Sequence, residues 1–316
     1  MDYRKIIFIS FVFSILILAA HAQAPVCSAA SKFYGKDSIN VTTFGASTVA
    51  GVGGFSFQED LQANIESCYT GVIVTVTKNG VSGQTTTEGL PRFLPAIAGR
   101  TGFIVILMGA NDALALADKK AVMATTEKNM RYYIETSLKN KLIPIIGTIQ
   151  FFNDKGDQRL KTANLYVSQI NTIYRRLVQQ YHVYLADVNR AIGRDYSLYQ
   201  DYVHPNAAGY KLISYVWFDA INRAIEDKLL VVGLNQNFPN PAVDRTSIGF
   251  SLSQAGHVVI NLYNIYGRFV KTLYDSYQNA GYSVVNLPLV NLDPGIYIYS
   301  MQVGGQILSK KMIVTR

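Results

Sequence analysis

The sequence predicts an α/β domain built on a parallel sheet, followed by a smaller all-β domain. Between about residues 38 and 228, short β-branched apolar runs alternate with longer stretches of helical period. This alternation is typical of a parallel sheet with helices on both faces. After residue 230 the apolar residues recur at every second position instead, as they do in half-buried strands. Gly233 and the cluster Pro239-Asn240-Pro241 interrupt the last helix, so we place the boundary near residue 232.

The elements of the α/β region follow from their own periodicity. Five apolar runs are expected to be strands: Ile39 to Phe44, Val72 to Thr77, Phe103 to Met108, Leu142 to Ile149 and Val183 to Val188. Four longer stretches are expected to be helices: Phe57 to Cys68, Lys119 to Leu138, Thr162 to Gln180 and Ala207 to Ile225. Ligands of such sheets bind beyond the carboxyl ends of the strands. Candidate functional residues are therefore sought just after each strand.

The C-terminal region is divided into short strands by glycine turns and by Asp293-Pro294-Gly295. The expected strands are Ile248 to Leu252, Val258 to Leu262, Phe269 to Leu273, Tyr282 to Leu287, Ile296 to Met301 and Ile307 to Val314. Strands at this spacing, with turns between them, predict a β-sandwich.

Composition excludes several classes of protein. The chain has 316 residues, of which 49% are hydrophobic and 16% charged, a balance that supports a folded core rather than disorder. Its net charge is +8, but no basic run concentrates that charge, so nucleic-acid binding is poorly supported. Two cysteines and four histidines, without an HExxH pair, argue against a metal site.

The N-terminus has the pattern of a signal peptide. Arg4 and Lys5 precede the uncharged run Ile6 to Ala20, and Ala20-His21-Ala22 supplies a cleavage site. The alternative is a membrane anchor, but about 15 apolar residues fall short of the roughly 20 needed to span a bilayer. We therefore expect cleavage after Ala22 and an exported, soluble chain without a transmembrane anchor.

Four short segments contain residue types that commonly act in catalysis. Three of them follow predicted strands and the fourth precedes the last predicted helix; they are Gly45-Ala46-Ser47-Thr48, Asn79-Gly80-Val81-Ser82-Gly83, Gly109-Ala110-Asn111-Asp112 and Asp201-Tyr202-Val203-His204-Pro205-Asn206. Each alone fits an ordinary structural role, because Gly45 permits a tight turn and Asn206 suits a helix cap. Together they supply a nucleophile, a base three residues from a carboxylate, and hydrogen-bond donors. This is the set that acyl transfer requires.

The four segments resemble the blocks of the SGNH (GDSL-type) hydrolase family, over about residues 38 to 228. The family's serine, glycine, asparagine and Asp-x-x-His pair match Ser47, Gly83, Asn111 and Asp201 with His204. The resemblance implies a serine esterase with a flavodoxin-like three-layer α/β/α fold over residues 23–231. The sequence departs from the common Gly-Asp-Ser pattern, since Ala46 stands in place of the acid.

The resemblance also assigns a role to each residue. Ser47 is the expected nucleophile, His204 its base, and Asp201 the carboxylate that fixes the imidazole tautomer. The N–H groups of Ser47 and Gly83 and the amide of Asn111 are the expected oxyanion donors. This chemistry needs no cofactor. Asp112 is expected to order the loop that carries Asn111.

The remaining three histidines are not expected to act as the base. His21 leaves with the signal peptide, His182 opens a strand, and His257 lies in the second domain. Of the four, His204 alone lies in one of the segments described above.

Residues 232–316 resemble the sorting domain of type IX (Por) secretion substrates. The matching features are the opening Leu234 to Pro241, the segment Val258 to Arg268, Gly295-Ile296-Tyr297 and the closing Lys310-Lys311-Met312. The resemblance implies an immunoglobulin-like sandwich that directs the chain to the type IX machinery and so to the medium or the cell surface. A carbohydrate-binding sandwich is the alternative, although isolated Tyr297 and Tyr299 suit strand positions better than a sugar platform.

Two further expectations concern the cysteines and the substrate. Cys27 and Cys68 both lie in the exported chain, where disulfides are permitted, and we expect them to pair; two separate thiols are the alternative. Connections between the blocks are short and offer no apolar insertion for a lid over Ser47. We therefore expect acetyl or other short esters, such as those on polysaccharides. The alternatives are a lipase or lysophospholipase, and a non-catalytic carbohydrate-binding surface protein.

Overall fold

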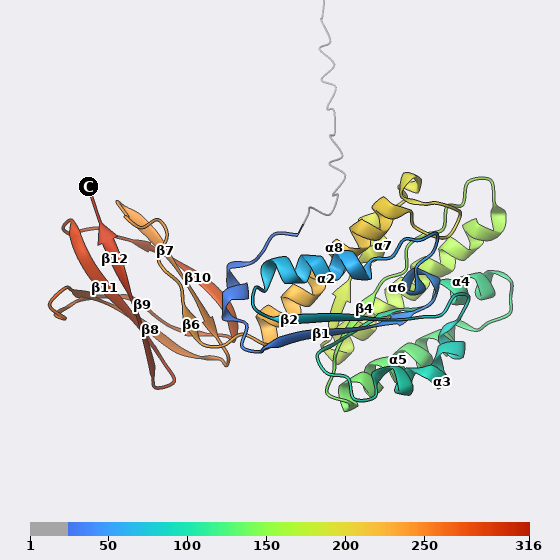
Figure 1. Cartoon of the computed structure of the whole chain (residues 1–316), viewed down its shortest axis with the longest axis horizontal. Coiled ribbons are helices and arrows are strands. Elements are labelled where there is room, and N and C mark those ends of the chain that lie inside the picture. Colours follow the sequence, from blue (N-terminus) through green and yellow to red (C-terminus); the bar gives the residue numbers. More distant parts are fainter. Residues whose placement is uncertain (1–24) are drawn as a thin grey trace, which may run out of the picture.

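The computed structural model describes residues 25–316 of the chain. A five-stranded parallel sheet lies between two layers of helices, and an antiparallel all-β region follows it (Figure 1). The predicted fold class is thus confirmed. The predicted signal peptide, residues 1–22, lies outside the described residues. Within residues 25–316, no helix is both long enough and apolar enough to cross a membrane.

The parallel sheet contains the five predicted strands, in the order β2-β1-β3-β4-β5. They are β1 (Ser38–Gly45), β2 (Ile73–Gly80), β3 (Phe103–Leu107), β4 (Ile143–Gly147) and β5 (Tyr184–Ala186). This is the flavodoxin-like order, in which ligands bind where the strand order reverses, between β1 and β3. The carboxyl ends of β1 and β3 are therefore the expected position of a site.

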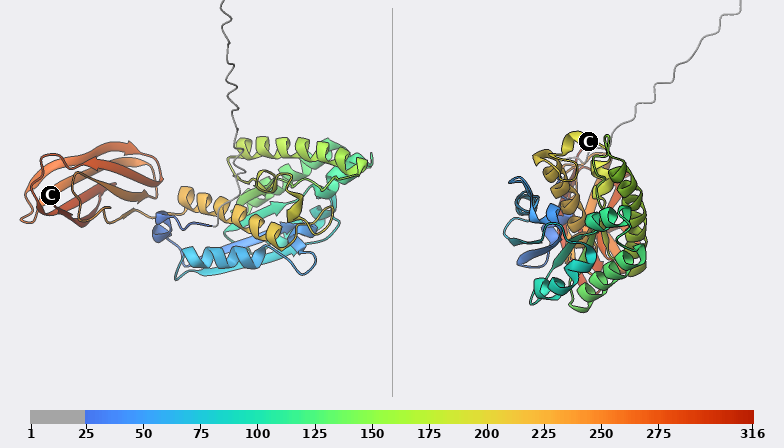
Figure 2. Two further views of the ribbon diagram at one scale, coloured as in Figure 1. Left: turned by 90° about the horizontal axis from the view of Figure 1, so that it is seen from above. Right: turned by 90° about the vertical axis from the view of Figure 1, so that its right-hand side faces the viewer.

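Helices cover both faces of this sheet. They are α1 (Ser47–Ala50), α2 (Gln58–Cys68), α3 (Thr86–Ile97), α4 (Ala110–Ala117), α5 (Met123–Lys139), α6 (Gln158–Tyr181), α7 (Val188–Ile192) and α8 (Ala207–Lys228). Alternate residues of β3 point to opposite faces, so Phe103 and Val105 join the core beneath α2 and α8. Ile104 and Ile106 join the core against α3, α5 and α6. Figures 1 and 2 show the three layers.

Four helices of the structure were absent from the sequence-based assignment: the short helices α1 and α7, and the longer helices α3 and α4. α3 contains Pro91 and Pro95. Proline is normally absent from the interior of a helix, because it lacks an N–H and its ring clashes with the preceding turn. α4 lies where a loop was expected after the strand that ends near Met108. The start of α3 is nevertheless marked in the sequence, because Thr85 and Glu88 have the spacing of a capping box and form one in the structure.

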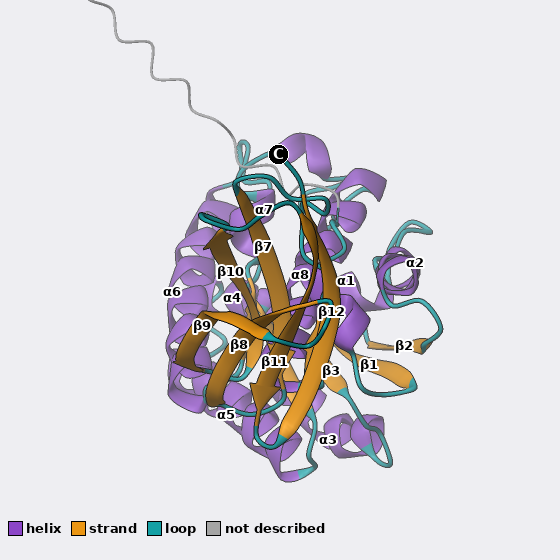
Figure 3. Ribbon diagram, turned by 90° about the vertical axis from the view of Figure 1, so that its left-hand side faces the viewer, coloured by secondary structure: helices purple, strands orange, loops and turns teal. Residues whose placement is uncertain are grey.

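The C-terminal region is antiparallel, and its core lies between two sheets (Figure 3). One sheet has the order β10-β7-β6 and the other β12-β11-β8-β9. The strands are β6 (Gly233–Leu234), β7 (Arg245–Leu252), β8 (Gly256–Asn264), β9 (Phe269–Gln278), β10 (Gly281–Pro288), β11 (Gly295–Val303) and β12 (Gln306–Val314). All six predicted strands are present, and the two-residue β6 is the one addition.

A short N-terminal segment, the 3-10 helix η1 (Ala29–Phe33), lies between the α/β region and the sandwich. The ring of Phe33 packs 6.3 Å from that of Tyr282 on β10, and its carbonyl accepts the N–H of Val231 at 2.9 Å. The segment is tied back to α2 by a disulfide between Cys27 and Cys68. By the chain-entropy model, closing a loop of this length stabilises the fold by about 4 kcal/mol.

Candidate active site

Ser47 is the first residue of α1, directly beyond the carboxyl end of β1. α1 lies unusually close to the sheet: a Cβ on Gly45 would stand 2.2 Å from Cγ2 of Val49 and 2.6 Å from the carbonyl oxygen of Leu107. Gly45 has no positive φ. Gly45 permits the tight turn from β1 into α1, as expected; it does so by lacking a Cβ, so that the helix that presents Ser47 can pack against the strand.

The structure brings Ser47, His204 and Asp201 together in one hydrogen-bonded chain. Nε2 of His204 lies 3.0 Å from Oγ of Ser47, and its Nδ1 lies 2.8 Å from Oδ2 of Asp201. Oδ1 of Asp201 accepts the backbone N–H groups of Val203 and His204, each at 2.7 Å. The Asp-x-x-His spacing thus folds into a single turn that orients the imidazole before any substrate is present.

The carboxylate of Asp201 is half exposed. Partial burial acts to raise its pKa, but the hydrogen bonds from the His204 ring and from the backbone N–H groups of His204 and Val203 outweigh it and lower the pKa below its usual value. Asp201 therefore stays ionised into mildly acidic solution and keeps its hydrogen bond to Nδ1 of His204.

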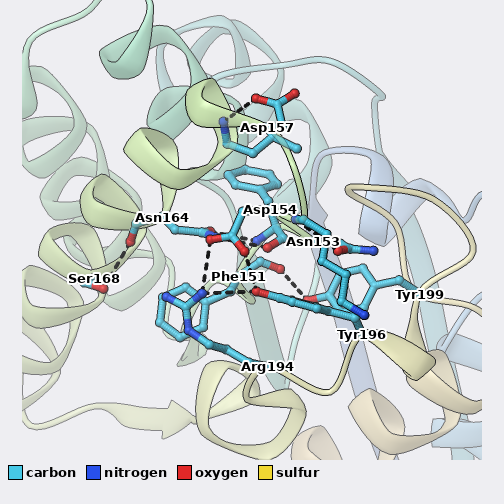
Figure 4. A network of polar contacts seen from close by, with 12 residues as sticks. Phe151, Asn153, Asp154, Asp157, Asn164, Ser168, Arg194, Tyr196 and Tyr199 are labelled. Atoms are coloured by element: carbon cyan, nitrogen blue, oxygen red, sulfur yellow. Dashed lines mark hydrogen bonds and ion pairs between the residues drawn. The ribbon is translucent and has the colours of Figure 1, made fainter.

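The loop that carries Asp201 and His204 is hydrogen-bonded to the loop after β4 (Figure 4). The carboxylate of Asp154 accepts hydrogen bonds from Tyr196 at 2.7 Å, from Arg194 at 3.1 Å and from the amide of Asn164 at 3.0 Å. The backbone N–H of Asn153 donates to the carbonyl of Tyr202 at 2.9 Å. Burial acts to raise the pKa of Asp154, and these three donors lower it overall. These contacts hold the loop of Asp201 and His204 against the loop that follows β4.

Of the expected oxyanion donors, Ser47 begins α1, Asn111 lies in the first turn of α4, and Gly83 lies in the loop between β2 and α3. Nδ2 of Asn111, at the start of α4, donates to the carbonyl of Gln84 at 2.9 Å, and its second N–H has no acceptor among the described residues. Gly83 is the preceding residue of the same loop, has φ +82°, and is exposed. Among the described residues, the N–H of Gly83 has no protein acceptor. The loop of Gly83 and the side chain of Asn111 are thus joined.

Asp112 connects α4 to α3. Its carboxylate is 3% exposed and accepts the N–H of Thr86 at 2.8 Å, the hydroxyl of Thr86 at 2.5 Å and the hydroxyl of Thr126 at 3.0 Å. Burial raises the pKa of Asp112 in spite of these hydrogen bonds. The side chain is saturated by structural donors, so it orders the base of the Asn111 loop, as expected.

A small cavity of about 10 Å³ lies beside Ser47. Its lining includes Ser47, Asn111, Ile149, Gln150 and Val203, but not Gly83. A volume of this size admits about one water-sized group. A larger hollow, of about 870 Å³, lies in the β-sandwich near the C-terminus, and none of the candidate site residues lines it.

The other titratable candidates lie away from this cavity. His182 caps the C-terminus of α6, and His257 pairs with Asp275 on the sandwich; His21 lies outside the described residues. Over residues 25–316, no cluster of three or more His, Cys, Asp or Glu side chains has the arrangement of a metal site.

Sequence reasoning missed three residues that support the site. Gln150, in the loop that follows β4, is 3% exposed and donates to the hydroxyl of Thr48 at 3.2 Å; its position directly after the predicted strand Leu142 to Ile149 was the available signal. Arg92 on α3 and Asp154 contact the loops of the site from outside any motif. No motif in the sequence marks them, because the hydrogen-bond partners of their side chains come from several different elements, between 8 and 47 residues away.

Residues 43–212 match the family model of the GDSL-like lipase/acylhydrolase family. Residues 236–315 match the model of the secretion system C-terminal sorting domain, which indicates secretion or attachment at the cell surface. No curated protein matches the sequence.

Solved structures share the fold of the α/β region. A single-residue variant of the acetyl xylan esterase Axe2 from Geobacillus stearothermophilus superposes with a TM-score of 0.51 at 16% identity, over 62% of this chain and 97% of that one. A second structure of that enzyme gives 0.50 at 16% identity, over 60% and 96%. The family model spans more than half of the residues. The chain therefore belongs to the GDSL-like lipase/acylhydrolase family and is a serine hydrolase that acts on ester bonds.

Proposed function

We propose that this protein is an exported esterase that removes acetyl or other short acyl groups from an esterified polysaccharide or small molecule. Ser47, His204 and Asp201 form its catalytic triad, and the oxyanion hole comprises the N–H groups of Ser47 and Gly83 with the amide of Asn111. The observation that carries the proposal is the 3.0 Å contact between Oγ of Ser47 and Nε2 of His204, with Asp201 on the other ring nitrogen.

The reaction follows from these contacts. Oγ of Ser47 attacks the ester carbonyl carbon while Nε2 of His204 takes its proton, and Asp201 stabilises the imidazolium that forms. The tetrahedral intermediate collapses, the C–O bond to the alcohol breaks, and His204 gives that oxygen the proton. A water molecule, deprotonated by His204, then attacks the acyl-enzyme. The acid is released and Ser47 is regenerated.

Asn111 is expected to contribute to the rate rather than to substrate binding. Asn111→Ala should lower kcat by about 10²–10³, the usual cost of one oxyanion donor, with little change in KM, since the interaction is made in the transition state. Steady-state kinetics on p-nitrophenyl acetate measure both constants. Asn140→Ala, which removes an exposed amide on another helix end, is the control. A change confined to KM would make Asn111 a substrate-binding residue instead.

Acyl length is expected to be short. The cavity beside Ser47 is small, about 10 Å³, which favours a methyl group over a long chain, and the similarity of the fold to acetyl xylan esterases agrees with this. An acyl groove would add about 0.8 kcal/mol for each buried CH₂, so kcat/KM would rise steeply with length. We expect p-nitrophenyl acetate to be preferred to the butyrate and decanoate esters under subsaturating conditions. Preference for decanoate would identify a lipase or lysophospholipase.

The two regions are proposed to be separable domains, residues 23–231 for catalysis and residues 232–316 for sorting. Every proposed catalytic residue precedes residue 232, so a chain ending at residue 231 should hydrolyse p-nitrophenyl acetate with the kcat and KM of the full chain. In a cell with the type IX machinery, the same truncation should stop delivery outside the cell. A folded, monodisperse truncation without activity would show that the sandwich builds part of the site, in favour of the carbohydrate-binding alternative.

A further inference from the structure

One arginine joins the separate parts of the proposed oxyanion hole. Arg92 lies in the middle of α3, and its guanidinium points at the carboxyl ends of β1 and β2. Nη2 donates to the carbonyl of Gly45 at 2.6 Å, Nη1 to the carbonyl of Asn79 at 2.8 Å, and Nε to Oε1 of Gln84 at 2.5 Å. One planar group thus spans two strands and the loop that follows them.

Two of these acceptors, Gly45 and Gln84, lie close to the groups expected to bind the oxyanion. Gly45 precedes Ser47 by two residues, and Gln84 follows Gly83 directly. The carbonyl of Gln84 accepts the amide of Asn111 at 2.9 Å. Arg92 is therefore linked to all three donors. It binds the carbonyl of Gly45, two residues before Ser47, and the side chain of Gln84, the residue after Gly83. Gln84 in turn accepts the amide of Asn111.

The cation of Arg92 is held without a counter-ion. Its guanidinium carbon lies 4.0 Å above the ring centre of Phe44. Across the described part of the chain, no carboxylate lies within ion-pairing distance of it. Burial lowers the pKa of the guanidinium, against a smaller opposing effect of Tyr133, but arginine remains charged. A fixed positive charge bound only to neutral acceptors suits a place where negative charge develops.

We propose that Arg92 is the positioning residue of the oxyanion hole. It fixes the ends of β1 and β2 and the loop of Gly83 and Gln84, so that the donors converge on one point. Arginine is required because its fork of N–H groups serves three acceptors in one plane, whereas the ammonium of lysine is a point charge on a flexible stem. The proposal rests on the assignment of Ser47, Gly83 and Asn111 to catalysis.

Arg92→Lys and Arg92→Met are the variants that test this role. Both should lower kcat on p-nitrophenyl acetate by about 10–10², less than the loss of an oxyanion donor itself, and should leave KM nearly unchanged. Affinity for phenylboronic acid, which mimics the tetrahedral intermediate, should fall by the same factor as kcat/KM. Arg131→Met removes an arginine of α5 that pairs with Glu127 at 2.8 Å and should change neither quantity.

The outcomes separate this proposal from the proposed function. If the wild type has no esterase activity, or Ser47→Ala keeps it, the proposed function fails. If the wild type is active and folded Arg92 variants keep its kcat and boronate affinity, the positioning role alone is rejected. Should both Arg92 variants misfold, Gln84→Ala removes one acceptor and keeps the cation. A kcat and boronate affinity lowered together in that variant supports the proposal, and unchanged values overturn it.

Discussion

Ser47→Ala is expected to reduce kcat for p-nitrophenyl acetate by about 10⁶, as loss of a serine nucleophile does in other hydrolases. The hydroxyl removed is the group that would form the acyl bond. Its one hydrogen bond among the described residues is with Nε2 of His204, so the fold should be retained. Progress curves with purified protein measure the loss, and circular dichroism checks the structure.

Ser168→Ala is a matched control for this substitution. Ser168 lies on α6, is exposed, and donates only to the carbonyl of Asn164 (Figure 4). It should keep full activity. Wild-type turnover in Ser47→Ala would contradict the assignment of the nucleophile, whatever the control does.

His204→Ala is expected to lower kcat by as much as Ser47→Ala does, because the serine hydroxyl is a weak nucleophile until a base takes its proton. The double variant should be no slower than either single variant, since residues that act as a unit are not additive. His182→Asn is the control: His182 has the left-handed backbone conformation, φ +51°, which asparagine tolerates. If losses multiplied in the double variant, the two residues would act independently and the triad would be wrong.

The sequence predicted most of the parallel sheet because local pattern and global fold agree there. Phe103 to Leu107 is a continuous apolar run, which a strand buried on both faces requires. α3 was missed because two prolines lie inside it; its capping box and its packing against β1 and α5 compensate in the structure. Local propensity alone could not weigh that tertiary contribution.

The residues of the site could be predicted where they lie together in short sequence motifs. Asp201 and His204 lie three residues apart and meet within one turn. Ser47 is 157 residues from His204. Ser47 was found at a strand end, and the resemblance to the SGNH family blocks related it to His204. Arg92 and Asp154 act through carbonyls and side chains from several elements. Such contacts depend on packing and leave no spacing to find.

Covalent labelling tests the central claim most directly. A fluorophosphonate reacts with an activated serine when its oxygen attacks phosphorus, the P–F bond breaks and the base takes the proton. Peptide mass spectrometry of the labelled full chain should find one adduct, on Ser47, and hydrolysis of p-nitrophenyl acetate should stop as the adduct accumulates. His204→Ala should label far more slowly. An adduct on another residue, or full inactivation with Ser47 unmodified, would contradict the account.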